Sequence, residues 1–279
     1  MRQILLINDI AGYGKVGMAA MLPILSYMGI PAFNLPTALV SNTLNYGEFT
    51  QLDTTEYMRQ TFPIWKRLGF HFDAICTGLM FNPEQAKLVA AYCREQAAEG
   101  CTVYVDPVMG DGGRLYNGID HRQVELMRQM VSVADLTIPN YTEACYLTDT
   151  PFRQEGITRE EARQMLRQLV AIGARSALIT SCVIDGSNQV CGYSSESFFF
   201  HEYEEIPGQF HGTGDIFAAV LIGSLMSGQS LSDATRRSMN VVSQMISRNR
   251  DVKDYMCGIF IERCLDLLND DSSAAQAAR

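Results

Sequence analysis

Short apolar segments alternate with longer amphipathic segments along most of this chain. Five stretches of four or five residues, each largely apolar and followed by polar or glycine residues, are typical of buried strands in a parallel sheet: 4–8, 73–77, 102–106, 136–139 and 177–180. Four longer stretches between them have helical spacing: 16–28, 83–98, 121–133 and 158–172. The alternation predicts an α/β fold with a doubly wound, mostly parallel sheet and helices on both faces.

The second half of the chain departs from this alternation. Residues 189–193 and 198–202 flank the short turn 194–197, which predicts an antiparallel strand pair near 189–202. Helices are expected over 216–226, 231–247 and 254–268, the second capped by Ser230 or Ser232. Because there is neither an internal repeat nor a linker, we expect a single domain over 1–268, and the small, polar residues 269–279 are expected to form a flexible tail.

Composition narrows the class of protein. The chain has 279 residues, 47% of them hydrophobic, and a formal net charge of −9. This acidic balance argues against a nucleic-acid partner or an anionic membrane surface and suits a soluble metabolic enzyme. No apolar run is long enough for a signal peptide or a membrane span, so we expect a cytoplasmic protein. The eight cysteines form no C-x-x-C pair, which indicates neither zinc nor a disulfide framework.

The most informative motif is the glycine turn His211-Gly212-Thr213-Gly214-Asp215, which leads directly into an apolar helix. Glycines let backbone N–H groups approach a ligand closely, and a helix start offers free N–H groups to an anion. A carboxylate beside such an anion site suggests phosphoryl transfer: Asp215 would accept the proton of an attacking hydroxyl, and the amides of Gly212 to Gly214 would stabilise the transferred group. The alternative is an ordinary turn in which Asp215 caps the helix.

The segment after the first predicted strand contains a G-x-G-x-x-G spacing at Gly12, Gly14 and Gly17. A dinucleotide site of this kind needs an acidic residue about twenty positions later, but residues 16–47 contain neither Asp nor Glu. The motif is therefore interpreted as a turn that contacts substrate. A P-loop is also excluded, because Val16 stands where the Walker motif needs a hydroxyl.

Two other predicted strands end in oxygen-bearing side chains. Asp106 begins a glycine-rich loop, and Asn140 and Glu143 lie three residues apart at a helix start. Magnesium prefers a few oxygen ligands together with waters and phosphate oxygens, so these three residues are candidate metal ligands, directly or through water. The alternative is that Asn140 and Glu143 only cap the helix.

Taken together, these motifs resemble the ribokinase-like superfamily and, within it, the vitamin B6 kinases that act on pyridoxal and pyridoxamine. The resemblance covers nearly the whole chain and is carried by the following motifs: Gly14-x-x-Gly17, Ser41-Asn42, Thr77-Gly78, Asp106-Pro107-Val108-Met109-Gly110-Asp111, Pro139-Asn140-x-x-Glu143, Thr180-Ser181 and Gly212-Thr213-Gly214-Asp215. It implies ATP-dependent phosphorylation of the 5′-hydroxymethyl group of a vitamin B6 form. Such kinases are commonly homodimers, often helped by a monovalent cation such as K⁺.

The resemblance also assigns roles to residues. It implies that Asp215 is the base, with Gly212, Thr213 and Gly214 as the anion hole, and that Mg²⁺ lies near Asp106, Asn140 and Glu143. It implies that ATP contacts Thr180, Ser181 and Thr213. The residues implied to bind substrate are Asp9, Gly14, Ser41, Thr43, Tyr46, Leu79 and Asp215.

This chain differs from the family where substrate is chosen. The serine that meets the pyridine ring aligns with Asp9, a histidine and a threonine are expected where Thr43 and Leu44 stand, and a common tyrosine is replaced by Leu79. Asp9 would accept a hydrogen bond from a protonated ring nitrogen, the 3-hydroxyl or the amine of pyridoxamine. We therefore hypothesise that pyridoxamine or pyridoxine competes well with pyridoxal; alternatively, Asp9 caps the turn or pairs with Lys15.

Other branches of the superfamily provide alternatives. Hydroxymethylpyrimidine kinases share Asp-Pro-Val-Met but often carry cysteine in place of Asp215. Sugar kinases add a strand-built lid after the first strand, whereas the pattern here predicts a helix directly from Val16. A non-catalytic, kinase-like ATP-binding protein also remains open.

Overall fold

A computed structural model describes residues 2–116, 119–208 and 210–269. Its main sheet has eight strands in the order β13-β12-β11-β10-β7-β6-β1-β3, parallel from β11 to β3 and antiparallel at β12 and β13. The strands are β1 Ile4–Ile7, β3 Ala32–Asn34, β6 Ala74–Thr77, β7 Thr102–Val105, β10 Leu136–Thr137, β11 Ser176–Ile184, β12 Ser187–Ser194 and β13 Ser197–Glu202. The five predicted parallel strands and the antiparallel pair are confirmed, and β3 was not predicted.

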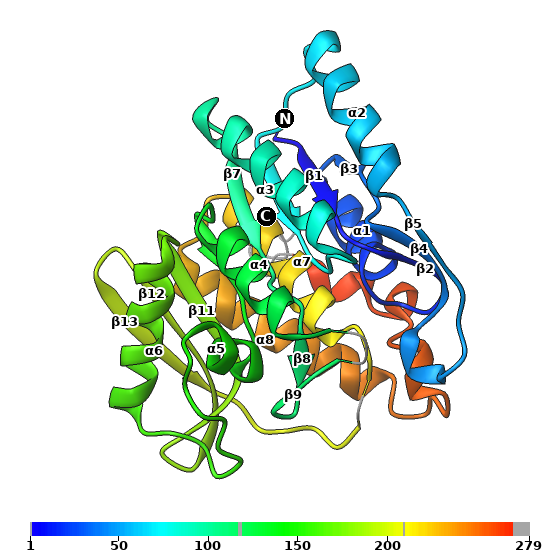
Figure 1. The fold of residues 1–279 in the computed structure, drawn as a ribbon. Helices are drawn as coiled ribbons and strands as arrows, with labels where there is room; N and C mark the ends of the chain where they lie inside the picture. The colour runs from blue at the N-terminus through cyan, green and yellow to red at the C-terminus, as the bar shows by residue number, and fades with distance from the viewer. Residues whose placement is uncertain (1, 117–118, 209, 270–279) are drawn as a thin grey trace, which may run out of the picture.

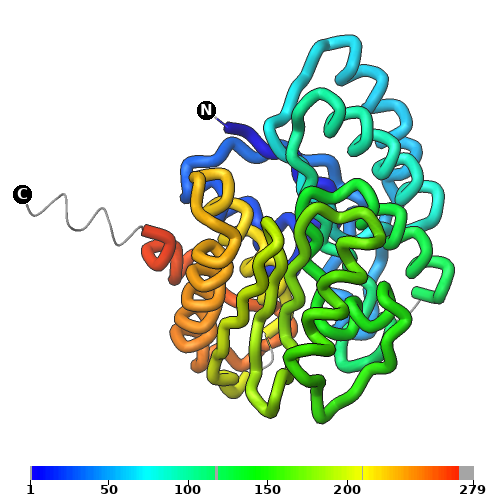
Figure 2. Tube along the Cα trace, turned by 90° about the vertical axis from the view of Figure 1, so that its left-hand side faces the viewer, coloured from blue at the N-terminus to red at the C-terminus, as the bar shows by residue number. Residues whose placement is uncertain are grey.

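Helices cover both faces of the sheet, as predicted. One buried core cluster contains side chains of α2 to α6, and the other contains side chains of α1, α7 and α8. Figure 2 shows this layering, with α8 in orange and the green α4 to α6 region on opposite sides of the yellow-green strands. The helices are α1 Met18–Tyr27, α2 Thr55–Leu68, α3 Pro83–Ala98, α4 His121–Val131, α5 Tyr141–Leu147, α6 Arg159–Ile172, α7 Thr213–Met226 and α8 Leu231–Arg248. No helix of the described ranges is long and apolar enough to cross a membrane.

The expected helix over 254–268 is wrong. This segment forms three short 3₁₀ turns, η2 Tyr255–Cys257, η3 Ile261–Arg263 and η4 Leu265–Leu268. Gly258 has φ 86°, and a Cβ on it would lie 2.9 Å from the His211 carbonyl oxygen and 3.1 Å from that of Lys15. Close docking of this glycine against two loops therefore outweighs local helix propensity.

The expectation that no strand-built segment follows the first strand is also wrong. Three strands, β2 Ile10–Tyr13, β4 Ala38–Asn42 and β5 Gln51–Asp53, form a separate small sheet in the order β2-β4-β5, beside α1 (Figure 1). A short turn, η1 Leu44–Tyr46, links β4 to β5, and helix α1 begins at Met18 rather than Val16. These strands have only three to five residues each, and β2 pairs with β4 across 29 positions, so their local pattern is weak.

Two shorter features complete the architecture. The loop after Asp106 forms a two-stranded hairpin, β8 Gly110–Asp111 and β9 Arg114–Leu115. The predicted tail falls almost entirely on 270–279, which lie outside the described residues. The single-domain assignment stays a prediction.

Candidate active site

The carboxyl ends of the parallel strands bring the predicted motifs to one edge of the main sheet. Asn8 and Asp9 follow β1, Asp106 follows β7, and Asn140 follows β10 by three residues. Thr180 joins this edge because its N–H donates to the Pro139 carbonyl oxygen at 3.0 Å. Motifs separated by more than 170 residues in the sequence therefore share one side of the molecule.

Asp215 lies in the first turn of α7, where two donors hold its carboxylate. Its Oδ2 accepts the Gly17 N–H at 2.8 Å, and its Oδ1 accepts from Nδ2 of Asn8 at 3.4 Å. Burial raises the pKa of Asp215 to about 6, against the lowering effect of these two hydrogen bonds. A carboxylate with this pKa is largely ionised near neutral pH and is a stronger base than an exposed aspartate.

Asp9 lies against the same glycine. A Cβ on Gly17 would lie 2.8 Å from Oδ1 of Asp9 and 2.5 Å from its carbonyl oxygen, so only glycine allows this approach. Burial, and then the charge of Asp215, raise the pKa of Asp9 to about 7. Apart from its own backbone N–H, no described residue donates a hydrogen bond to the Asp9 carboxylate, and Lys15 pairs with Glu262 instead. The carboxylate thus remains available to a ligand.

The glycine turn has the geometry expected of an anion site. Gly212 is the N-cap of α7 with φ 81°, and a Cβ there would lie 2.0 Å from the Lys15 carbonyl oxygen. Gly214, by contrast, has open space around the position of a Cβ. The Thr213 hydroxyl donates to the Phe210 carbonyl oxygen at 3.5 Å. One glycine is therefore required by packing, and the other leaves the helix start open.

Acidic side chains gather beside this turn. Burial, then Glu143 and Asp215, hold the pKa of Asp106 well above its usual range, and its carboxylate has no hydrogen-bond partner among the described residues. Asp111 acts electrostatically on His211, whose pKa burial lowers, and on Tyr116, whose pKa burial raises. This concentration of negative charge would be relieved by a cation.

Asn140 and Glu143 form a capping box at the start of α5. Oδ1 of Asn140 accepts the Glu143 N–H at 2.9 Å, and Oε2 of Glu143 accepts the Asn140 N–H at 2.9 Å. Oε1 of Glu143 also accepts the Met109 N–H at 3.0 Å, and Nδ2 of Asn140 donates to the Gly110 carbonyl oxygen at 2.9 Å. Burial raises the pKa of Glu143 to about 8. The capping interpretation is thus confirmed. Glu143 accepts backbone hydrogen bonds from Met109, Asn140 and Gly110, whereas Oδ1 of Asn140 accepts the Glu143 N–H and keeps a lone pair for a water.

A divalent cation would meet a mixed set of donors here. Among the described residues, no three His, Cys, Asp or Glu side chains are arranged to hold a metal by themselves. Asp106 offers an unpaired carboxylate, whereas the side chains of Asn140 and Glu143 already hold the loop. This set suits Mg²⁺, which usually takes one or two carboxylates and fills its remaining positions with water and phosphate oxygens.

Thr180 and Ser181 lie where β11 is irregular. The pairing of β11 with β12 shifts register between Ile179 and Cys182, and Ser181 has φ 55°, which is uncommon for a residue other than glycine. The bulge leaves Ser181 exposed next to Thr180. Such strain at an irregularity inside a strand is typical of a site where backbone or hydroxyl groups are turned toward a ligand.

The remaining predicted substrate residues divide into two groups. Gly14 packs on Thr43, whose hydroxyl donates to the Met256 carbonyl oxygen at 2.9 Å, and the Tyr46 hydroxyl bonds to Asp254. These contacts join the small sheet to η2. Ser41, by contrast, is exposed and bonds to Asn42 and the Thr50 N–H within the small sheet, and the Leu79 N–H donates to Asn8.

Sequence reasoning missed Asn8, Gly17 as a donor to Asp215, and the segment 254–258. Asn8 is a polar residue at a strand end, but that position alone does not reveal its contact with Asp215. The role of 254–258 depends on contacts with residues more than 200 positions earlier, for which the sequence contains no local signal.

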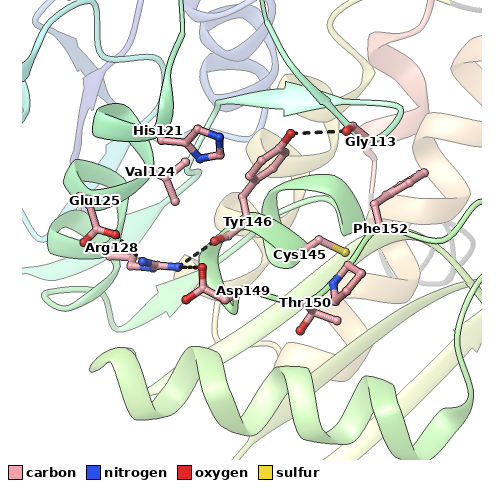
Figure 3. Close-up of a pocket in the computed structure, with 11 residues that line it drawn as sticks. Gly113, His121, Val124, Glu125, Arg128, Cys145, Tyr146, Asp149, Thr150 and Phe152 are labelled. Carbon is pink, nitrogen blue, oxygen red and sulfur yellow. Dashed lines mark hydrogen bonds and ion pairs between the residues drawn. The ribbon is translucent and has the colours of Figure 1, made fainter.

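A pocket of about 420 Å³ lies elsewhere, against α4, α5 and the loop that follows α5 (Figure 3). Arg128 lies at its rim and pairs with Glu125 and Asp149, while Tyr146 points toward the Gly113 carbonyl oxygen. None of the predicted site residues lines it.

The chain is similar in sequence and in structure to known kinases. Residues 13–259 match the family model described as phosphomethylpyrimidine kinase. The chain is 26% identical over 250 residues to the pyridoxine/pyridoxal/pyridoxamine kinase of Bordetella pertussis, covering 86% of each chain. A crystal structure of a putative phosphomethylpyrimidine kinase from Bacteroides thetaiotaomicron is 35% identical, with a TM-score of 0.91 and coverage of 96% of this chain and 93% of that one. An orthorhombic form with pyridoxal is 34% identical, with a TM-score of 0.90 and coverage of 96% and 95%. Pyridoxal kinase from Lactobacillus plantarum is 27% identical, with a TM-score of 0.86 and coverage of 96% of each chain.

Proposed function

The chain belongs to the phosphomethylpyrimidine kinase family, and we propose that it is an ATP-dependent kinase that phosphorylates the 5′-hydroxymethyl group of pyridoxal, pyridoxamine or pyridoxine. The observation that carries this proposal is the geometry of Asp215. Its carboxylate is ionisable near neutral pH, partly buried, and held at a helix start next to an open glycine turn. That is the arrangement required to deprotonate a hydroxyl beside a phosphoryl group.

In this mechanism, Asp215 accepts the proton of the attacking hydroxyl. The N–H groups at the start of α7, around Gly212, Thr213 and Gly214, stabilise the charge on the transferred phosphoryl group. Exposed Ser181 and neighbouring Thr180 contact the ATP phosphates. In this proposal the acceptor binds near Asp9 and Asp215, and the nucleotide binds near Thr180 and Ser181.

Magnesium is proposed to bind at the acidic cluster. Asp106 is the residue that would hold it directly, and Asn140 and Glu143 would act through water because their side chains hold the capping box. When bound, the metal ion neutralises charge on the triphosphate. As in similar kinases, a monovalent cation such as K⁺ is proposed to assist the reaction.

Asp9 is proposed to influence which vitamer is preferred. Its unpaired carboxylate beside Asp215 favours an acceptor that brings a positive charge or a hydrogen-bond donor, as pyridoxamine does. Replacing Asp9 with Ser should reduce kcat/KM for pyridoxamine more than for pyridoxal. Unchanged relative values of kcat/KM for the three vitamers would contradict this role.

Phosphorylation of hydroxymethylpyrimidine is the second candidate function. It is favoured by the family model and by the description of the Bacteroides thetaiotaomicron structure. The aspartate at position 215 and the relatives described as pyridoxal kinases favour the vitamin B6 forms.

The decisive experiment measures ADP formation with pyridoxal, pyridoxamine, pyridoxine and hydroxymethylpyrimidine side by side, with Asp215→Asn as the control. We expect turnover on a vitamin B6 form that falls by a factor of about 10²–10⁴ in the variant. Turnover on the pyrimidine alone would assign the chain to the second function. Thermal stabilisation by Mg-ATP and a vitamer without product would indicate a binding protein.

We also propose that the protein is a homodimer and that it is located in the cytoplasm. Large exposed apolar side chains concentrate in residues 33–70, on the small sheet, on α2 and next to them: Phe33, Leu39, Leu44, Phe49, Leu52, Tyr57, Ile64, Leu68 and Phe70. Such a concentration is typical of an interface.

All eight cysteines are buried and unpaired, which suits a reducing compartment.

A further inference from the structure

Asn8 connects the base to the backbone of the sheet. It is only 4% exposed and follows β1 directly. Its Oδ1 accepts two backbone N–H groups, those of Asp9 and Leu79, each at 2.9 Å. With its carbonyl oxygen fixed by two donors, the amide plane has one orientation, and its NH₂ group points to Oδ1 of Asp215 at 3.4 Å.

The sequence makes room for this amide. A Cβ on Gly78 would lie 2.3 Å from Oδ1 of Asn8 and 2.5 Å from its Nδ2. Gly78 is itself fixed, because its N–H donates to the Ile7 carbonyl oxygen at 3.0 Å. The ends of β1 and β6 are therefore built around the Asn8 side chain.

We propose that Asn8 is a positioning residue for phosphoryl transfer: it orients the Asp215 carboxylate together with the Gly17 N–H, so that a remaining lone pair faces the acceptor hydroxyl. This inference rests on the proposed role of Asp215 as base. The N–H···O distance of 3.4 Å is long, as is common for hydrogen bonds of catalytic groups before substrate binds. Shortening of this bond in the transition state would lower the barrier without strengthening substrate binding.

Other ionisable groups act on Asp215, so the experiment must separate positioning from charge. Asp9 approaches it from the end of β1, and Asp106 from the end of β7. The Cys76 thiol on β6 and the Tyr116 hydroxyl after β9 also interact with it electrostatically. A change in charge alone shifts the pH profile, whereas loss of orientation persists at high pH, where Asp215 is fully ionised.

The test uses two variants: one replaces the Asn8 amide, and the other displaces it. Asn8→Asp keeps an acceptor for the N–H groups of Asp9 and Leu79 but replaces the donor to Asp215 with an oxygen. Gly78→Ala keeps Asn8 intact and forces its amide to move. Asn34→Asp, at an exposed position of β3, is the matched control for one added negative charge.

For both site variants we expect kcat at pH 9 to fall at least about tenfold while KM for the acceptor changes less than about threefold. In Asn8→Asp the acid limb of kcat/KM should also move up by about one pH unit, because the variant replaces a donor with a negative charge. Asn34→Asp should match the wild type. A kcat at pH 9 that stays at the wild-type value in both folded variants, or a loss confined to KM, would overturn the proposal.

A second readout needs no turnover. The pKa of Asp215 can be measured by carboxyl ¹³C NMR, with Asp215→Asn to assign the resonance, and we expect it to rise in Asn8→Asp and Gly78→Ala. An unchanged pKa would overturn the contact between Asn8 and Asp215 itself. If the wild type phosphorylates none of the acceptors, the proposed function fails, and the NMR titration still decides whether Asn8 contacts Asp215.

Discussion

Asp9 illustrates how burial, rather than residue type, sets the chemistry of a side chain. Its pKa is near 3.8 in the unfolded chain and rises to about 7 in the folded protein. Between these values the folded state holds a proton that the unfolded state has lost. The stability that Asp9 contributes is therefore fully present below pH 3.8 and is lost as the pH rises through 7.

This reasoning predicts a pH-dependent effect of Asp9→Asn. At pH 8 the variant should be more stable than the wild type by about 2 kcal/mol, roughly half of what the full pKa shift implies, since the side chain is partly open to solvent. At pH 5 the gain should be less than half as large. Denaturant unfolding at the two pH values measures both free energies, and an equal gain at both would show that Asp9 ionises normally in the folded state.

The sequence indicated the role of a residue only where the residue type allows few kinds of chemistry. Asp215 and Asp106 stood out because a carboxylate at a strand or helix end has few roles. Asn8 did not, because an asparagine becomes informative only when its hydrogen-bond partners are known. The partner of Asp215 lies 207 positions away from it.

At the scale of elements, the start of α7 depends on two glycines with different roles. Gly212 has a left-handed φ and packs on the Lys15 carbonyl oxygen, whereas Gly214 lies inside the first helical turn with space around it. The motif therefore contains one glycine required by packing and one that leaves room for a ligand.

The two glycines should respond differently to alanine. Gly212→Ala should lower the melting temperature, because a Cβ would overlap the Lys15 oxygen and the left-handed conformation costs an L-residue about 1–2 kcal/mol. It should also reduce kcat by a factor of about 10² as the N–H groups move. Gly214→Ala is the matched control for stability and should leave the melting temperature unchanged or slightly higher. Equal destabilisation by both would contradict the assignment.

Helix boundaries were predictable where capping chemistry is local. Asn82, Thr158 and Ser230 cap α3, α6 and α8 with their own side chains, and these three helices begin within one residue of the expected positions. Helix α1 has no side-chain cap, and its start follows from packing against Asp9. Helix α2 has the local helical spacing of Met58 and Phe62, but Pro63 inside it argues against a helix. Strand β2 was missed because it pairs with β4, whose residues lie 29 positions away.

At the scale of the whole molecule, the small sheet adds an exposed apolar surface to the protein. Leu39 and Leu52 pair across β4 and β5 on its exposed face, and Leu52 is 61% exposed. Full burial of a leucine side chain contributes about 2 kcal/mol, so a few such residues can hold a dimer together.

We predict that sedimentation analysis will show a dimer and that Leu52→Asp will dissociate it. A charge buried at the centre of an apolar interface has no partner, which weakens association by several kcal/mol. Gln51→Asp adds the same charge on the opposite face of β5 and should leave the dimer intact. A wild-type chain that is monomeric at every concentration would contradict the prediction, as would a Leu52→Asp variant that still dimerises.

The sequence by itself determined the layered α/β architecture and predicted the proposed base and the edge of the sheet where the candidate site residues gather. Those features follow from apolar periodicity and from residues at strand ends, which are properties of neighbouring positions. Only the tertiary structure decided that Asn8 and Gly17 hold Asp215, that Asn140 and Glu143 hold each other, and that residues 254–258 dock on Thr43 and Tyr46. Each of these depends on contacts whose geometry is set when the chain packs, and hydrogen bonds over a few ångströms cannot be inferred from a spacing in sequence.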